Sequence, residues 1–387
     1  MNVSELLSKV EKGDSNAMNC IGTHYKNIGD YDSVIKYYLI KYYHMAIEKG
    51  NSSAMYNMGL YYENIKDYMN MIKYYMMAIE RGNTKAMFNL GYYYENIKDY
   101  MNMIKYYIMA IECDNIYAMF GLGKYYYNVK DYDNMRKYYV MAIEHGDSNS
   151  MFGLGLYYKN IEDYDNMKKY YLMAIEKDNS TAMCGLGIYY HNIEDYDNMK
   201  KYYLMAIKYE ESGAMYSLGE YYHKIKDYDN MKKYYHMAIE KEDSDAMYSL
   251  GEYYHKIKDY DNMKKYYHMA IEKEDSDAMY NLGIYYEEIE KDYIQMEKYY
   301  MMAIKQMTEN NTLKDNYEIM ERLSSYYKKK QKQSNNNNII EPYKSCYRCL
   351  DKYVSSSKKI ICEHKDICKE CILNLDKCMK CGVEYEK

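Results

Sequence analysis

Proline is almost absent from this sequence: a single one, Pro342, occurs among 387 residues. Because proline is the strongest helix breaker, its scarcity favours a nearly all-helical chain. Tryptophan is missing and phenylalanine occurs only 3 times, whereas there are 61 tyrosines and 35 methionines. A large core must therefore be built mainly with tyrosine rings, which pack well while their hydroxyls stay hydrated or hydrogen-bonded.

Long apolar runs and a strong positive charge are lacking as well. No segment approaches the roughly 20 apolar residues that a membrane helix needs, and the first residues, MNVSELLSKVEKGD, do not read as a secretory signal. The net charge of −6, from 52 Lys and Arg against 58 Asp and Glu, disfavours bulk electrostatic binding to nucleic acid. We therefore expect an intracellular, cytoplasmic protein that binds neither membranes nor nucleic acid.

The chain is dominated by an internal repeat. An Ala-Met pair recurs in steps of 32 residues, with Ser150 replacing the alanine once, at Ala54, Ala86, Ala118, Ala182, Ala214, Ala246 and Ala278. Ala17 lies 37 residues before Ala54, because the first unit has five extra residues around positions 37–41. Each unit start is followed five places later by a glycine, at Gly22, Gly59, Gly91, Gly123, Gly155, Gly187, Gly219, Gly251 and Gly283. The sequence thus contains nine units.

Each unit is predicted to be a helix–turn–helix. In the unit from Ala86, apolar residues recur at helical spacing on both sides of the segment Asn-Ile-Lys-Asp, residues 96–99. Asp99 is suited to cap the N-terminus of the second helix, with the turn at Lys98. Gly91 and Ala110 are small residues at which the two helices can approach closely. Met71, Met103 and Met135 are predicted to fill the core.

A single hairpin cannot bury its apolar face, whereas stacked hairpins can. We therefore predict an all-α, right-handed solenoid of about nine repeats over residues 1–330, with a groove for protein partners. Residues 6–18 form a half-repeat cap in this interpretation, and Leu313–Lys330 a closing helix. Residues 331–342, QKQSNNNNIIEP, are predicted to be a flexible, low-complexity linker.

Several residues in the repeats have more than one interpretation. Units 219–250 and 251–282 differ only at Ser249 and Asn281, so we interpret the histidines in them as solvent-facing positions copied by duplication rather than metal ligands: His223, His236, His255 and His268. The tyrosine pairs, such as Tyr61-Tyr62 and Tyr74-Tyr75, are interpreted as packing residues rather than a stacking surface for single-stranded nucleic acid. The scattered cysteines, Cys20, Cys113 and Cys184, are expected to be small buried residues.

The repeat resembles the Sel1-like branch of the tetratricopeptide superfamily. The resemblance is carried by the spacing of Ala86, Leu90-Gly91, Tyr94, Tyr107 and Ala110-Ile111. It covers roughly residues 5 to 305, and it implies a scaffold that binds proteins. The usual Sel1-like unit is longer, with a glycine-containing loop between its helices that is missing here.

The other seven cysteines cluster in residues 343–387 together with one histidine. The spacing C-x2-C-x12-C-x-H-x3-C-x2-C-x6-C-x2-C gives eight candidate zinc ligands: Cys346, Cys349, Cys362, His364, Cys368, Cys371, Cys378 and Cys381. Eight such ligands make two closed, tetrahedral, structural zinc sites. A segment this short has little core of its own, so zinc binding would supply its folding free energy.

The order of these ligands resembles a RING finger, especially the compact C-terminal RINGs of inhibitor-of-apoptosis proteins. In that family the ligand pairs alternate in a cross-brace, which would place Cys346, Cys349, Cys368 and Cys371 on one zinc and Cys362, His364, Cys378 and Cys381 on the other. The resemblance implies that a ubiquitin-conjugating enzyme docks on apolar residues beside the ligands, here Leu350, Ile372, Leu373 and Leu375. It also leaves room for dimerisation through the RING.

Two functions remain open from the sequence. In the first, the repeats recruit a substrate and the RING acts as a ubiquitin ligase, which has no active-site residue of its own. In the second, the chain is a non-catalytic adaptor whose zinc module only binds proteins or dimerises. Leu350 favours the first function. Met379 and Gly382 favour the second, because they replace the proline and the cation that often follow the last two RING ligands.

Overall fold

A computed structural model describes residues 3–27, 33–309 and 317–334. In these residues the chain forms twenty α-helices and one π-helical turn, and no strand occurs among them. The helices fall into two compact units, Met1–Tyr189 and Tyr190–Lys387. The helical chain expected from the scarcity of proline and the helix–turn–helix repeats expected from the 32-residue step are both confirmed for the described residues.

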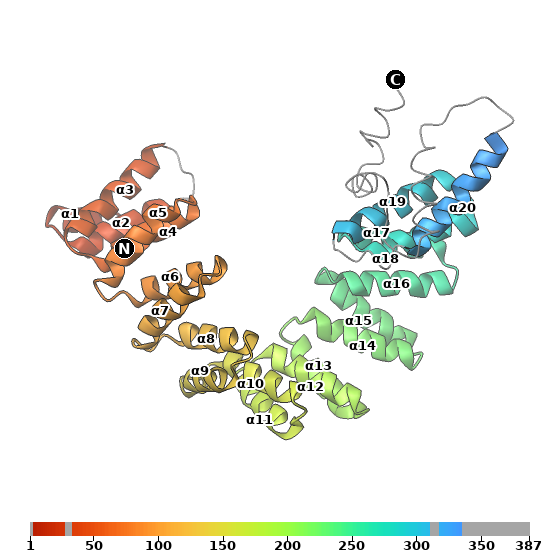
Figure 1. Ribbon diagram of the computed structural model, residues 1–387, viewed down its shortest axis with the longest axis horizontal. Coiled ribbons are helices and arrows are strands. Elements are labelled where there is room, and N and C mark those ends of the chain that lie inside the picture. The colour runs from red at the N-terminus through yellow and green to blue at the C-terminus, as the bar shows by residue number, and fades with distance from the viewer. Residues whose placement is uncertain (1–2, 28–32, 310–316, 335–387) are drawn as a thin grey trace. The chain divides into compact units, whose positions relative to one another are not determined.

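The first unit consists of successive helical hairpins preceded by one short helix (Figure 1). Its helices are α1 (Val3–Glu11), α2 (Ser15–Asn27), α3 (Ser33–Glu48), α4 (Ser52–Asn64), α5 (Tyr68–Ile79), α6 (Thr84–Asn96), α7 (Tyr100–Ile111), α8 (Ile116–Asn128), α9 (Tyr132–Glu144), α10 (Ser148–Asn160) and α11 (Tyr164–Ile175). Helix α12 (Ser180–Asn192) contains the boundary between the two units.

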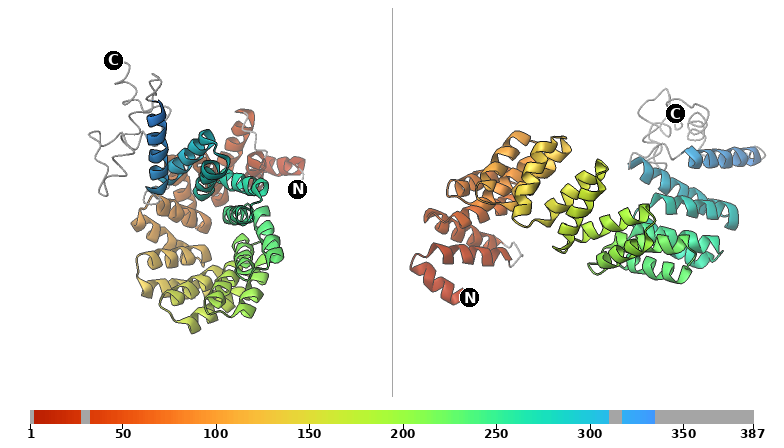
Figure 2. Two further views of the ribbon diagram at one scale, coloured as in Figure 1. Left: turned by 90° about the vertical axis from the view of Figure 1, so that its right-hand side faces the viewer. Right: turned by 90° about the horizontal axis from the view of Figure 1, so that it is seen from below.

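The second unit continues the same pattern. Its helices are α13 (Tyr196–Ile207), α14 (Ser212–Lys224), α15 (Tyr228–Glu240), α16 (Ser244–Lys256), α17 (Tyr260–Glu272), α18 (Ser276–Tyr285), the π-turn η1 (Tyr286–Glu290), α19 (Tyr293–Glu309) and α20 (Tyr317–Ser334). Within each unit, every hairpin lies against the next one along the chain, as the views in Figure 2 also show.

The turn inside each hairpin is built as the sequence predicts. Lys98 adopts a left-handed backbone conformation, with φ of 61°, and the amide of Asp99 donates a hydrogen bond of 2.9 Å to the carbonyl of Tyr94. This geometry satisfies a carbonyl at the end of α6. The Asp99 carboxylate then accepts a hydrogen bond of 3.2 Å from the amide of Asn102, which caps α7. The predicted N-cap is confirmed.

Stacked tyrosines join the two helices of each hairpin. Tyr94 of α6 and Tyr106 of α7 are parallel to within 4°, with ring centroids 5.7 Å apart. The ammonium group of Lys105 lies 5.1 Å from the Tyr106 centroid, within the range of a cation–π contact. The core predictions are confirmed too, since Met71, Met103 and Met135 are fully buried.

A second tyrosine contact joins successive hairpins. Tyr100 begins α7, and its ring lies 5.1 Å from that of Tyr125 in α8. Equivalent pairs include Tyr68–Tyr93, Tyr132–Tyr157, Tyr196–Tyr221 and Tyr228–Tyr253. Tyr61, Tyr74 and Tyr75 are buried, so the interpretation of the tyrosine pairs as packing residues is confirmed for them.

Both ends of the repeat array carry an extra helix. At the N-terminus, Leu6 of α1 packs against Ala17 and Ile21 of α2. At the other end, α20 buries Ile319, Met320 and Leu323 against α19. Helix α20 continues past Lys330 to Ser334, so the first residues of the predicted linker are helical. The start of the predicted closing helix, at Leu313, lies outside the described residues.

An inserted residue interrupts the regular spacing before α19. Tyr267 and Tyr300 occupy equivalent buried positions but are 33 residues apart rather than 32. The extra residue is absorbed by the π-turn η1, which ends at Lys291 in the left-handed conformation. Arg322 of α20 then makes ion pairs of 3.0 Å with Glu287 and Glu288 of this turn. The π-turn therefore helps to dock the closing helix.

The prediction of buried cysteines in the repeats is wrong. Cys20 and Cys113 are exposed, and Cys184 is half-buried. Cys20 faces away from the buried side of α2, which is formed by Ala17, Met18, Ile21 and Gly22. Cys113 lies just after the end of α7, in the loop that leads to α8.

No helix in the described part of the chain has both the length and the apolar character needed to cross a bilayer.

Candidate partner-binding pockets

The predicted zinc ligands and docking residues lie outside the described residues. They are Cys346, Cys349, Leu350, Cys362, His364, Cys368, Cys371, Ile372, Leu373, Leu375, Cys378 and Cys381. Among the residues that the structure does describe, no group of three or more histidine, cysteine or acidic side chains could hold a metal ion.

Two neighbouring pockets in the second unit gather polar side chains from successive repeats. One is lined by His223 of α14 and by four residues of α16: Glu252, Tyr253, His255 and Lys256, with a volume of about 390 Å³. The other is lined by His191 of α12 and by four residues of α14: Glu220, Tyr221, His223 and Lys224, with a volume of about 330 Å³. His223 belongs to both pockets.

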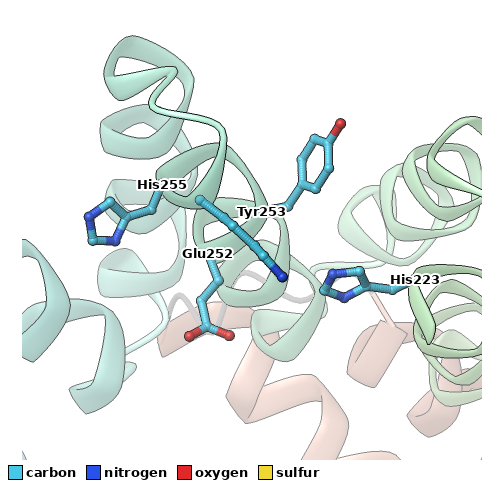
Figure 3. Close-up of a pocket in the computed structure, with 5 residues that line it drawn as sticks. His223, Glu252, Tyr253 and His255 are labelled. Atoms are coloured by element: carbon cyan, nitrogen blue, oxygen red, sulfur yellow. The ribbon is translucent and has the colours of Figure 1, made fainter. Parts of the chain in front are cut away.

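The two pockets are copies of each other because the lining residues recur in the 32-residue repeat. Glu220 and Glu252 occupy equivalent positions, as do Lys224 and Lys256. Figure 3 shows His223 reaching from its helix toward α16, while His255 points to the opposite side of α16. In each pocket, one helix therefore contributes a histidine, and the next helix contributes the remaining lining residues.

Tyrosine rings hold the shared histidine in place. The His223 ring meets Tyr253 edge-on at 6.5 Å, with an interplanar angle of 90°. It also lies 6.3 Å from Tyr228, which follows it in the chain at the start of α15. Both contacts restrict the imidazole without using its nitrogen atoms, which stay available to a ligand in the pocket.

The glutamates of the two pockets interact with tyrosines, the buried Tyr235 and the half-buried Tyr248. Glu220 accepts a hydrogen bond from the hydroxyl of Tyr235. Burial, followed by the hydrogen bond and charge of Glu220, raises the pKa of Tyr235. Burial and then Glu252 likewise raise the pKa of Tyr248. The phenols thus stay protonated as donors, and the Glu220 carboxylate is anchored at one side of its pocket.

Sequence reasoning placed all four duplicated histidines in solvent. That interpretation is confirmed for His236 and His268, which are exposed. It missed that His223 and His255 are half-buried and line pockets. The signal was present in the sequence: each of these two histidines is followed by lysine and preceded three places earlier by glutamate.

The pockets present hydrogen-bond donors and acceptors side by side. Lysine ammonium groups donate, imidazoles donate or accept, and the glutamate carboxylates accept. This mixture suits a peptide, whose backbone offers N–H and C=O groups along its length.

Comparison with known proteins identifies the type of repeat. A tetratricopeptide repeat family model matches six segments, residues 52–81, 84–115, 148–179, 180–212, 212–240 and 244–272. A protective antigen of uropathogenic Escherichia coli with an SLR fold is 18% identical, with a TM-score of 0.54, and the match covers 100% of this chain and 94% of that one. A Sel1 repeat protein from Oxalobacter formigenes is 24% identical over 57% of this chain and 98% of its own, with a TM-score of 0.46. No curated protein matches the chain.

The matched segments, which form α4–α7 and α10–α17, are therefore similar to tetratricopeptide repeats. Repeats of this kind form a scaffold suited to protein–protein interaction. The likeness to the E. coli antigen concerns the fold alone.

Proposed function

We propose that this protein is an interaction scaffold that recruits a substrate through its helical repeats and transfers ubiquitin to it through a C-terminal RING. The repeats support the scaffold role. The ligase role is supported by one observation in the sequence, the eight zinc ligands spaced in RING order between Cys346 and Cys381. Those ligands would hold two structural zinc ions.

The role proposed for this chain in ubiquitin transfer is to position the conjugating enzyme. A RING holds a ubiquitin-conjugating enzyme in place, and the reactive thioester belongs to that enzyme. Leu350 directly follows the ligand Cys349, so a zinc ion would fix its backbone. An apolar residue on a rigid loop is suited to anchor a partner. Ile372, Leu373 and Leu375 would complete the same surface.

The alternative is an adaptor without ligase activity. It is favoured by Met379 and Gly382, which stand where a RING ligase often has proline and a cation. The zinc ligands are unaffected by these two replacements, so the adaptor would keep the zinc fold and could still bind proteins or dimerise.

An autoubiquitination assay with a panel of conjugating enzymes separates the two functions. The full-length chain is incubated with ubiquitin, activating enzyme and each conjugating enzyme in turn. Zinc-dependent ubiquitin chains with at least one conjugating enzyme are the expected result. A folded, zinc-loaded protein that is inactive with the entire panel would instead establish the adaptor.

A further inference from the structure

The duplicated repeats concentrate positive charge at one end of their first helices. The last residues of that helix and the turn after it read ENIK at 63–66 and 95–98, YNVK at 127–130, KNIE at 159–162 and HNIE at 191–194. At 223–226 and 255–258 the same positions read HKIK. These two segments, which we call the HKIK patch, each carry two lysines and no acidic residue.

The patch is continuous with the two pockets. Lys224 and Lys256 are exposed and line them together with His223 and His255. Lys226 and Lys258 are exposed in the turns, each held in the left-handed conformation. Within the described residues, none of these four lysines forms an ion pair.

Three of the neighbouring carboxylates have hydrogen-bond partners of their own. Asp227 and Asp259 follow the patch, but each caps the helix after it and binds the side-chain amide of an asparagine, at 2.8 Å in both cases. Glu220 accepts the hydrogen bond of Tyr235. The patch therefore presents four ammonium groups that have no ion-pair partner among the described residues, in a chain whose net charge is −6.

We propose that the HKIK patch binds an acidic, extended segment of a partner protein. The segment crosses α14 and α16, its carboxylates reach the four lysines, and its backbone lies over the two pockets. Neighbouring packed helices are about 10 Å apart, and an extended chain advances about 3.3 Å per residue. In the polyproline II form of an extended chain, three residues make one turn and advance about 9 Å, so acidic residues spaced three apart lie on one side of the peptide and would meet successive repeats.

A peptide fits the patch better than a nucleic acid does. The carboxylates of Glu220 and Glu252 line the same pockets. A nucleic acid crossing them would bring its charged phosphate backbone against these carboxylates, whereas a peptide carries its charge on side chains that can turn to the lysines while its neutral backbone lies over the pockets. A peptide backbone has N–H groups that can donate hydrogen bonds to these carboxylates, whereas a phosphodiester backbone has no donor of this kind. The histidines and lysines can meanwhile donate to peptide carbonyls and acidic side chains.

This proposal rests on the scaffold role and names the class of partner that the repeats take. It is independent of the RING, because binding and ubiquitin transfer are measured separately. If the chain fails to transfer ubiquitin, the proposal that the HKIK patch binds a peptide is unaffected. If the peptide does not bind, the ligase proposal is still tested separately by ubiquitin transfer.

The test uses fluorescence anisotropy with the full-length chain. The probe is a labelled peptide of about 12 residues, long enough to cross both repeats, with glutamate at every third position. A second peptide with glutamine in place of glutamate is the neutral control. We expect the acidic peptide to bind, the glutamine peptide to bind at least about tenfold more weakly, and binding to weaken as salt is raised.

The chain supplies its own matched variants. The quadruple variant Lys224→Asn, Lys226→Glu, Lys256→Asn and Lys258→Glu converts both segments to HNIE, which occurs naturally at 191–194. Because that segment forms the same turn, with Glu194 at φ of 60°, the variant is expected to keep the helical content. The control variant, Lys66→Glu with Lys98→Glu, makes the same kind of change in the first unit.

We expect the HNIE variant to lose peptide affinity by about tenfold or more, and the control variant to keep it. Unchanged affinity in the folded HNIE variant overturns the proposal, as does equal binding of the glutamine peptide. An RNA oligonucleotide that binds this patch more tightly than the acidic peptide overturns it in favour of a nucleic acid.

Discussion

The ring of Tyr107 in α7 lies directly on the backbone of Gly91 in α6. A Cβ atom added to Gly91 would be 2.5 Å from the ring Cδ1 of Tyr107 and 2.8 Å from its Cε1. Beyond the ring, the Tyr107 hydroxyl donates a hydrogen bond of 2.6 Å to Glu95. The same contact recurs between Gly22 and Tyr43, Gly59 and Tyr75, Gly123 and Tyr139, Gly155 and Tyr171, Gly219 and Tyr235, Gly251 and Tyr267, and Gly283 and Tyr300.

Substitution of this glycine tests whether the contact holds the hairpin together. Tyr107 is buried, so its ring has no free space to move into when Gly91→Ala adds a methyl group. Overpacking of this kind costs about 1–3 kcal/mol. We expect the free energy of unfolding, measured by circular dichroism in urea, to fall by about this amount.

Gly213 provides the matched control. It also lies in a first helix, α14, but nothing is within 4 Å of a Cβ placed there. Because glycine in a helix is less favourable than alanine by about 0.5–1 kcal/mol, Gly213→Ala should be neutral or stabilising. Equal losses of stability from the two substitutions would show that the ring contact does not matter.

The helix caps predict an acid transition. Hydrogen bonds from Asn134, first its side chain and then its backbone, lower the pKa of Asp131. The same arrangement lowers the pKa of Asp67, Asp163, Asp195 and Asp227. A carboxylate whose pKa is lower in the folded state stabilises the fold above its unfolded pKa of about 3.9, and this stabilisation is lost as the pH falls toward the folded value.

We therefore expect helicity to be lost cooperatively below about pH 4. A variant with Asp67, Asp131, Asp163, Asp195 and Asp227 changed to Asn should lose less stability between pH 5 and pH 3, because asparagine caps a helix without titrating. Thermal melts followed by circular dichroism at each pH give the comparison. An unchanged pH dependence in this variant would rule the caps out as its source.

The repeat could be predicted from the sequence because its signals are local. A capping aspartate such as Asp99 and the fixed position of Gly91 identify each hairpin within one 32-residue unit. The pockets could not be predicted in this way, because His223 and Glu252 meet only when α14 packs beside α16. The insertion before Tyr300 is visible in the spacing, but whether it lengthens a loop or forms a π-turn depends on the packing of α19 and α20.

The exposed cysteines illustrate the same distinction. Cys20 was expected to be buried because free cysteine usually is. Its position on α2 leaves it exposed instead, because the buried face of this helix is formed by Ala17, Met18 and Ile21. Whether a residue in these repeats is buried is therefore predicted better from its type together with its position around the helix than from its type alone.

The metal content of the full-length chain tests the C-terminal assignment. We expect two zinc ions per chain by elemental analysis of freshly reduced protein. Chelation should remove them without abolishing the far-ultraviolet signal of the repeat helices, which bury their own core. Cys362→Ser should lose zinc, whereas Cys113→Ser, which changes an exposed cysteine of the repeats, should keep both ions. One zinc ion, or none, in the unmodified chain would refute the two-site assignment.

Leu350→Ala distinguishes docking from packing in the RING. If Leu350 anchors the conjugating enzyme, its loss removes about 2 kcal/mol of binding, which corresponds to roughly a tenfold or greater loss of ubiquitin transfer. Zinc content and folding should be unchanged. If Leu350 instead packs inside the module, against Ile360, Ile361 and Leu373, the substitution will release zinc or unfold the segment.

The most direct test of the proposed ligase is the discharge of ubiquitin from a charged conjugating enzyme to free lysine. A conjugating enzyme that supports autoubiquitination is loaded with ubiquitin, and the thioester is followed on non-reducing gels with and without the full-length chain. We predict that the zinc-loaded chain accelerates discharge, and that Leu350→Ala reduces this acceleration about tenfold while retaining two zinc ions. A zinc-loaded, folded chain that leaves the rate of discharge unchanged would contradict the account and leave the adaptor function in its place.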